Sequence, residues 1–291
     1  MYHTLHSAIL YSKVGRILKT LDRLSIQETT FVYFASDHGA HIDIGAKGGS
    51  NMPFKGGKGM GAIEGGIRVP GVIRYPRIMN KNKADDIDMP TTLMDFLPTV
   101  KQILEEENDS DEIFLRNPID GKSFLSLLQG QTKNQHTFIR HYCGTTIHAL
   151  RLITEKSIHK AWFKRPLLNE NGHCGEGKLC SCFGNSNELK DFGCDIEIFD
   201  LGKDPLEETA ISNNSKTYNE LKLKFLKEYV RIENNISSNM MKCYVENTHD
   251  RNTKIAVASD EFDTPSQLSS FFEVMPRPWM QPCAKFPFCS K

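Results

Sequence analysis

The segment of residues 29–76 constrains the fold most, because it joins two β-rich runs through a loop rich in glycine and charge. The first run, residues 31–35 (FVYFA), is too short for a helix and ends abruptly at Ser36-Asp37-His38-Gly39. The second run covers residues 69–75. In open α/β sheets, ligands bind in the crevice outside the carboxyl ends of the strands. We therefore expect a buried strand that delivers the polar side chains of Asp37 and His38 to a site.

The loop between the two runs contains Lys55-Gly56-Gly57-Lys58-Gly59 and then Glu64-Gly65-Gly66-Ile67-Arg68. Glycines let the backbone approach a ligand closely, and a lysine among them adds one positive charge. Carboxylate, imidazole and ammonium groups in one short span therefore predict a site for a metal and an anion. The alternative is a turn aspartate, a structural histidine and a mobile surface loop. Glu64 and Arg68 are interpreted as a structural ion pair at the corner between loop and strand.

Four motifs of this segment, ASDHGAH, GGSN, FKGGKGMG and EGGIRVPGVIRYP, resemble the sulfatase family, specifically its arylsulfatase and steryl-sulfatase branch. Asp-His-Gly alone also occurs in related phosphatases and phosphodiesterases of the alkaline-phosphatase superfamily, whereas KGGKG followed by EGGIRVPG is specific. The likeness continues to the end of the chain. It implies an alkaline-phosphatase-like, doubly wound α/β domain, present in part, followed by a smaller subdomain.

The resemblance also implies roles for individual residues. Asp37 and the next residue, His38, would ligate one calcium ion, and Lys58 would bind the sulfate of a small-molecule aryl, steroid or sugar-type sulfate ester. A divalent cation and an ammonium suit the charge that spreads onto the departing oxygen. Calcium prefers oxygen ligands, so His38 departs from the Asn or Gln of many members. Whether His38 binds the ion, lies beside it or favours zinc stays open. His41 is a weaker candidate for the same site.

Sulfatases use as nucleophile a cysteine in a Cys-x-Pro-x-Arg motif, oxidised to formylglycine. None of the eight cysteines here is followed by that pattern. The resemblance thus implies the C-terminal half of a sulfatase, with formylglycine expected in the missing N-terminal half and no activity from this chain alone. We expect a truncated gene model or partial transcript rather than a genuine short protein.

Two other functions are compatible with the same sequence. One is a metal-dependent phosphatase or phosphodiesterase of the same superfamily, in which His38 would ligate zinc. The other is a non-catalytic half-domain that binds a partner through its uncovered surface.

Composition excludes some partners. Lys plus Arg equals Asp plus Glu, 36 against 36, so no global charge attracts nucleic acid or an anionic membrane. No apolar run approaches the roughly 18 residues that cross a bilayer, and Met1 does not open a signal-peptide pattern. Steryl-type members are often membrane-associated, but through a segment upstream of the part present here.

Two domains are expected, residues 1–135 and residues 136–291, because residues 120–128 resemble the turn and closing helix of the family's large domain and the sequence pattern then changes. The first opens with an amphipathic helix over residues 5–24, which precedes the central strand and fits a parallel, doubly wound arrangement. Asp95 is interpreted as a capping or ion-pair residue. The second should be a small antiparallel sheet packed on one helix near residues 218–232; its β-rich runs are residues 137–142, 149–153, 160–163 and 196–201.

The chain has eight cysteines, and disulfides among them would need an oxidising compartment. The family resemblance favours the disulfides Cys174–Cys180, Cys143–Cys182 and Cys283–Cys289, and leaves Cys194 and Cys243 unassigned. A zinc knuckle is the alternative for the cluster Cys174, Cys180 and Cys182. Glycosylation sequons begin at Asn108, Asn213 and Asn235. The complete protein is therefore expected in the secretory pathway, that is the endoplasmic reticulum, Golgi, lysosome or extracellular space.

Overall fold

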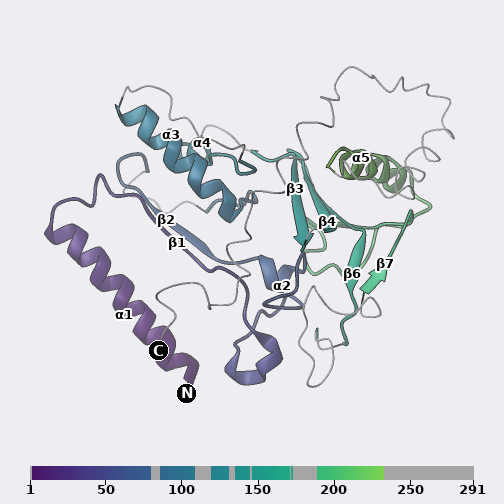
Figure 1. Ribbon diagram of the computed structural model, residues 1–291, viewed down its shortest axis with the longest axis horizontal. Coiled ribbons are helices and arrows are strands. Elements are labelled where there is room, and N and C mark those ends of the chain that lie inside the picture. The colour runs from purple at the N-terminus through teal and green to yellow at the C-terminus, as the bar shows by residue number, and fades with distance from the viewer. Residues whose placement is uncertain are drawn as a thin grey trace, which may run out of the picture. The chain divides into compact units, whose positions relative to one another are not determined.

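A computed structural model gives the fold (Figure 1). It describes residues 2–79, 86–108, 119–130, 135–144, 146–170, 172 and 189–232. All of these belong to one compact unit, Met1–Asn247. The predicted division near residue 135 stays a prediction. None of the described helices is both long and apolar enough to cross a membrane.

The two β-rich runs around the glycine loop form strands β1 (Val32–Ala35) and β2 (Gly71–Arg74). They pair antiparallel, with Val32 opposite Arg74 and Ala35 opposite Gly71. The sequence predicted a parallel neighbour for the first strand, and the described residues contain none. The reason is local: the loop after β1 folds back, and the Ser36 N–H donates to the Pro70 carbonyl at 3.3 Å, so the chain returns beside the strand that it left. The loop of residues 36–70 therefore sits at the carboxyl end of β1.

One face of this two-stranded sheet is covered by helix α3 (Phe96–Asn108), which follows the short 3₁₀ turn η2 (Leu93–Asp95). Aromatic rings make the contact, with Tyr33 stacked on Phe96 at a centroid distance of 5.6 Å and Phe31 tilted against Phe96 at 6.1 Å. Phe31 also lies edge-on to Tyr75, which directly follows β2, at 5.6 Å. Helix α4 (Leu125–Leu128) adds the buried Leu125 to the same cluster.

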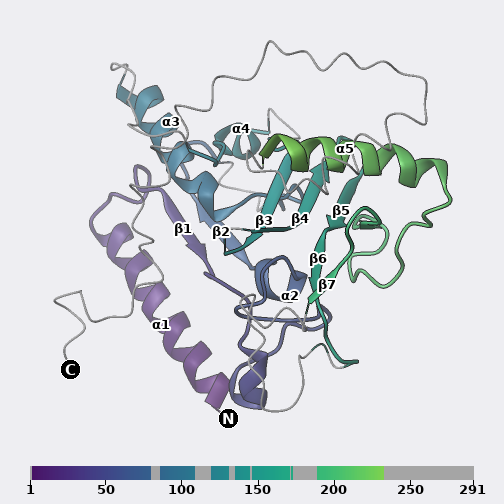
Figure 2. The same ribbon diagram turned by 45° about the vertical axis from the view of Figure 1, so that its right-hand side comes forward.

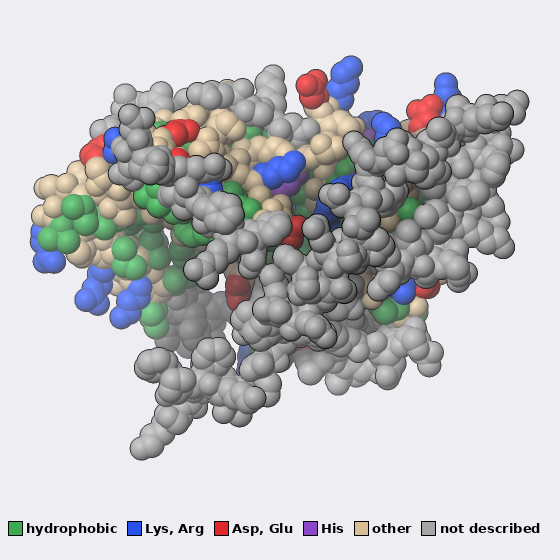
Figure 3. Space-filling model, turned by 45° about the horizontal axis from the view of Figure 1, so that its top comes forward, with side chains coloured by type: hydrophobic (Ala, Val, Ile, Leu, Met, Phe, Trp, Pro, Cys, Tyr) green, Lys and Arg blue, Asp and Glu red, His purple; other side chains and the backbone are tan. Residues whose placement is uncertain are grey.

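The predicted N-terminal helix is confirmed as α1 (Tyr2–Arg23). Its apolar side chains are largely exposed, and so are Phe34 of β1 and Val72 of β2; the exposed set on the helix and just after it is Ile9, Leu10, Tyr11, Ile17 and Leu24. Hydrophobic side chains interspersed with lysine and arginine are visible on part of the surface in Figure 3. Helical periodicity thus predicted the helix, but it did not predict that many of its apolar side chains would be exposed.

The second half of the described chain is an antiparallel sheet in the order β3-β4-β5-β8. Its strands are β3 (Phe138–Cys143), β4 (Thr146–Ile153), β5 (Ile158–Trp162) and β8 (Glu197–Asp200), and a small pair, β6 (Lys164–Pro166) with β7 (Leu189–Asp191), lies beside it. Every β-rich run predicted in this region is confirmed as a strand.

Helix α5 (Lys216–Ile232) lies across one face of this sheet (Figure 2). The predicted apolar stripe of α5 is buried there, through Tyr218, Leu221, Phe225 and Tyr229. The opposite face packs through Ala149, Trp162 and Phe199 against Met60, Ala62 and Ile63 of the glycine-rich loop. The loop is therefore held between β1 on one side and the second sheet on the other.

Asp95 serves both of the purposes predicted for it. Its fully buried carboxylate accepts hydrogen bonds from the Thr92 N–H at 2.7 Å, which caps the helix, and from the Lys122 N–H at 2.8 Å. His136 Nε2 lies 2.9 Å from Oδ1. Burial alone would raise the pKa of Asp95, but the hydrogen bonds from His136, Lys122 and Thr92 outweigh it and leave the pKa below its ordinary value.

This lowered pKa predicts acid sensitivity. The stabilisation by ionised Asp95 is complete above the pKa of the unfolded chain, ordinarily 3.8, and is lost as pH falls through the lower folded-state pKa. Asp95→Asn should lower the free energy of unfolding at pH 7 by about 1–3 kcal/mol. It should also flatten the pH dependence between about pH 5 and about pH 2, measured by urea unfolding. Asp22→Asn, at an exposed ion pair with Arg74, is the control and should leave that dependence unchanged. If the free energy of unfolding changed equally with pH in Asp95→Asn and in wild type, the lowered pKa of Asp95 would be contradicted.

Candidate active site

The carboxyl end of β1 forms a short, internally bonded turn. The Ser36 hydroxyl donates to the His38 carbonyl at 2.7 Å, and His38 Nδ1 donates to the Gly39 carbonyl at 2.8 Å. Nε2 of the same ring lies 3.4 Å from Asp37 Oδ2. The Asp37 side chain is 84% exposed and that of His38 37%, so both are accessible to a ligand.

Asn51 fastens this turn to the loop that carries Lys58. Its side-chain oxygen accepts from the Ala40 N–H at 2.7 Å, while its amide donates to the carbonyls of Ala40 at 3.1 Å and Gly56 at 2.9 Å. The Lys58 N–H also donates to the Ala40 carbonyl at 3.0 Å. Asp37, His38 and Lys58 therefore belong to one bonded unit, with the Lys58 side chain exposed. That their side chains converge on one bound ion and one anion stays a prediction.

Sequence reasoning gave Asn51 no role, although it belongs to the GGSN motif. Its position between two glycine-rich stretches could have indicated this bridging role. There, an amide that both donates and accepts satisfies two backbones at once.

The glycines of the loop serve mainly to bring backbone against backbone. A Cβ on Gly39 would lie 1.8 Å from the Gly65 carbonyl oxygen, and one on Gly57 would lie 2.3 Å from the Ala40 oxygen. The Gly39 N–H donates to Gly66 at 2.9 Å, and the Gly65 N–H to Lys55 at 2.9 Å. The sequence suggested close approach to a ligand; the structure shows close approach of three chain segments to one another.

His41 lies in the same unit, just before the 3₁₀ turn η1 (Ile42–Lys47). Its Nε2 is 3.8 Å from Oδ2 of Asp43, whose side chain is only 4% exposed. Nothing in the described structure brings the His41 ring to Asp37 or Lys58, so its role as a site residue stays a prediction.

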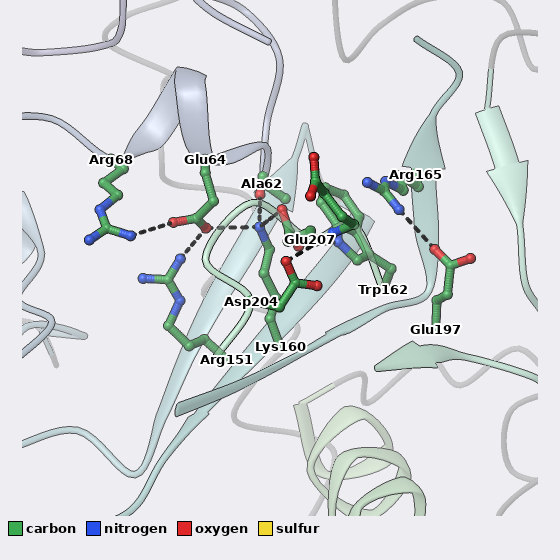
Figure 4. A network of polar contacts seen from close by, with 11 residues as sticks. Ala62, Glu64, Arg68, Arg151, Lys160, Trp162, Arg165, Glu197, Asp204 and Glu207 are labelled. Atoms are coloured by element: carbon green, nitrogen blue, oxygen red, sulfur yellow. Dashed lines mark hydrogen bonds and ion pairs between the residues drawn. The ribbon is translucent and has the colours of Figure 1, made fainter. Parts of the chain in front are cut away.

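Glu64, at the start of the short helix α2 (Glu64–Ile67), anchors the loop to the second sheet through a buried network of charges (Figure 4). The predicted pair with Arg68 is present, at 4.0 Å, but the closer partners are Arg151 of β4 and Lys160 of β5, whose Nζ lies 2.9 Å from Oε1. Lys160 is fully buried and also bonds the Ala62 carbonyl and, at 3.2 Å, Glu207.

Trp162 completes this network. Its indole N–H donates to Glu207 at 2.6 Å, and Lys160 Nζ lies 4.6 Å from the centre of its ring. Burial would raise the pKa of Glu64, but the positive charges of Lys160 and Arg151 outweigh burial and lower the pKa. Glu64 is thus ionised within the fold and serves structure, as the sequence analysis expected.

The donor chemistry only partly suits the calcium that the resemblance implies. Asp37 offers the hard oxygen that calcium prefers, whereas His38 offers nitrogen. Among the described residues, no three His, Cys, Asp or Glu side chains gather closely enough to hold a metal. A metal there would need further ligands from water, substrate or other residues.

Only two of the eight cysteines, Cys143 and Cys194, lie among the described residues, and both are disulfide-bonded. The predicted partner Cys182 and the pairs Cys174–Cys180 and Cys283–Cys289 lie outside the described residues, as does Cys243, so the pairing stays a prediction. Asn213 is exposed in the loop before α5. The Asn108 side chain and Asn235 also fall outside the described residues.

Two family models match the chain. The model described as "Sulfatase" matches residues 10–105, and the model described as "C-terminal region of aryl-sulfatase" matches residues 134–291, more than half of the sequence. This chain belongs to the sulfatase family. The sulfatase resemblance found in the motifs around Asp37 and Lys58 is thereby confirmed.

Curated sulfatases give the same result. The chain is 32% identical over 287 residues to human arylsulfatase D, covering 95% of this chain and 42% of that protein. It is 38% identical over 213 residues to human steryl-sulfatase, covering 70% and 35%. This sulfatase chain therefore spans well under half the length of these relatives.

Among solved structures, the chain resembles the crystal structure of PsFucS1 sulfatase from Pseudoalteromonas sp., with a TM-score of 0.54 and 22% identity, covering 79% of this chain and 41% of that one. At this identity the likeness concerns the fold alone. It confirms the predicted alkaline-phosphatase-like class for this sulfatase chain.

Proposed function

We propose that this chain supplies part of the active site of a sulfate-ester hydrolase. Asp37 and His38 would hold the metal, and Lys58 would bind the sulfate group. The observation that carries the proposal is the bonded unit around Ala40 and Asn51, which keeps the Lys58 loop beside the Asp37-His38 turn. The membership in the sulfatase family supports the reaction class.

The chemistry follows from the charge of a sulfate monoester. Negative charge grows on the departing oxygen as the bond to sulfur breaks, and a fixed ammonium near the sulfate oxygens stabilises it. A divalent cation, calcium by family analogy, would polarise the same group when bound. The substrate would be a small aryl, steroid or sugar-type sulfate ester, in keeping with relatives named arylsulfatase and steryl-sulfatase.

The chain has no Cys-x-Pro-x-Arg motif, so on the family pattern the formylglycine nucleophile belongs to a part that is not in this sequence. We propose that the chain binds sulfate without turning over esters by itself, since losing a covalent nucleophile removes most of the rate. The disulfide-bonded Cys143 and Cys194 support a secretory-pathway location for the complete protein. The boundary near residue 135, between the catalytic portion and a disulfide-rich second portion, is part of the same proposal.

Sulfate binding tests the role of Lys58. Lys58→Ala should weaken the binding of 4-nitrophenyl sulfate by about tenfold, the effect of losing roughly 1.4 kcal/mol of charge-assisted interaction. Binding is followed by ligand-observed NMR titration. Lys58→Arg keeps the positive charge but changes the shape of the charged group, so its affinity should lie between those of wild type and Lys58→Ala. Lys19→Ala, an exposed lysine of α1, is the matched control and should bind like wild type.

Two results would contradict the proposal. One is equal affinity for the sulfate ester in wild type and Lys58→Ala. The other is release of 4-nitrophenol by the purified wild-type chain at a rate that Lys58→Ala abolishes, which would show that the chain is catalytic without formylglycine.

A further inference from the structure

The histidine at the carboxyl end of β1 is held in one orientation by its own backbone. His38 Nδ1 lies 2.8 Å from the Gly39 carbonyl oxygen, which can only accept, so Nδ1 carries the ring proton. In the neutral ring, Nε2 is then an unprotonated lone pair. A histidine whose other nitrogen donates to a backbone carbonyl has the arrangement usual for a metal ligand.

The second ring nitrogen, Nε2, lies close to the neighbouring carboxylate. Nε2 of His38 and Oδ2 of Asp37 are 3.4 Å apart. With a protonated ring this contact is an ion pair; with a neutral ring both atoms are acceptors, and a cation between them would make their approach favourable. In a tetrahedral site with bonds of about 2.0–2.2 Å, two ligand atoms lie about 3.4 Å apart, so the separation fits one edge of such a site.

The two donors differ from the set that calcium takes. Calcium binds oxygen ligands, six to eight of them, whereas imidazole nitrogen suits zinc and the later divalent transition metals. Each of the two side chains is partly or largely exposed, which leaves room for water or sulfate oxygens to complete the shell. The donor chemistry of this turn thus disagrees with the calcium implied by family membership.

We propose that Asp37 Oδ2 and His38 Nε2 bind one borderline divalent ion, of the zinc or cobalt type, in preference to calcium. The inference rests on the proposed sulfate-ester site, because it names the metal of that site. His38 sets the preference, and Asp37 supplies the charge that any cation would use.

The test uses the full chain with ¹³C,¹⁵N-labelled histidine, freed of metal by chelation and titrated separately with Zn²⁺, Co²⁺ and Ca²⁺. The ring signal of His38 is identified as the one missing from His38→Asn. It should shift with Zn²⁺ and broaden with paramagnetic Co²⁺ at concentrations at least tenfold below those at which Ca²⁺ has any effect. His38→Asn should weaken Zn²⁺ binding at least tenfold and leave Ca²⁺ binding equal or stronger. Asp37→Asn should weaken both ions.

His159→Asn is the control for other imidazoles, since His159 lies in β5 and should not affect the His38 response. If His38 signals do not respond to Zn²⁺ or Co²⁺ while Ca²⁺ binds through Asp37 regardless of His38→Asn, the inference is wrong; the proposed sulfate site then still stands if Lys58→Ala weakens binding of the sulfate ester. If no ion affects either residue and sulfate binding is also independent of Lys58, the proposed function fails with it.

Discussion

Replacing Lys160 with methionine is expected to lower the free energy of unfolding by about 3–5 kcal/mol, the usual cost of removing one partner from a buried ion pair. Lys160 is fully buried between Glu64 and Glu207, and its ammonium also bonds the Ala62 carbonyl. Methionine fills similar volume, so the loss comes from the carboxylates left without their shared cation. Urea unfolding monitored by tryptophan fluorescence measures the change, since the Trp162 indole donates to Glu207 in the same network.

Two further variants separate this charge effect from a general loss of packing. Lys203→Met, at a side chain 87% exposed, should change stability by less than about 0.5 kcal/mol. Adding Glu207→Gln to Lys160→Met removes one of the unpaired charges and should restore part of the loss. If the destabilisation of the double variant equalled the sum of the destabilisations of the two single variants, Lys160 and Glu207 would not interact energetically.

Gly39→Ala is expected to destabilise the chain by about 3 kcal/mol or more, at the upper end of overpacking effects. The added methyl would lie 1.8 Å from the Gly65 carbonyl oxygen, and that oxygen is backbone that cannot turn aside. The hydrogen bond from the Gly39 N–H to the Gly66 carbonyl would be strained as well. Thermal unfolding followed by circular dichroism gives the size of the effect.

Gly15→Ala is the matched control, because a methyl at Gly15 in α1 meets nothing within 4 Å. There the same substitution should stabilise the helix by about 0.5–1 kcal/mol. If Gly39→Ala were as stable as Gly15→Ala, the close contact between the segments around Gly39 and Gly65 would be wrong.

Local patterns predicted the elements well, and for a physical reason. The β-rich runs that became β4 and β5 and the three-and-four spacing of α5 express burial within a few residues, and the side chains of these elements are indeed largely buried. The motifs around Asp37 and Lys58 identified the family, and the backbone bond from Lys58 to Ala40 explains why the two motifs occur together.

Contacts between distant residues could not be predicted in the same way. Lys160 lies in β5, and its partner Glu64 is 96 positions away, so no local spacing joins them. The sequence suggested Arg68 as the partner because it lies one helical turn away, and that pair is the longer one, at 4.0 Å. The antiparallel pairing of β1 with β2 was missed because the return path depends on the loop between them. The glycines were predicted to lie against a ligand, because the sequence alone does not show whether they approach a ligand or another segment of backbone.

The ion pair between Glu64 and Lys160 has a consequence for the order of folding. Closing so long a stretch of chain costs entropy before the contact forms, which makes such contacts late events. The loop bearing Lys58 is therefore expected to acquire its final shape only after β4 and β5 have paired. Amide hydrogens of residues 55–67 should accordingly gain protection in refolding later than those of β4 and β5.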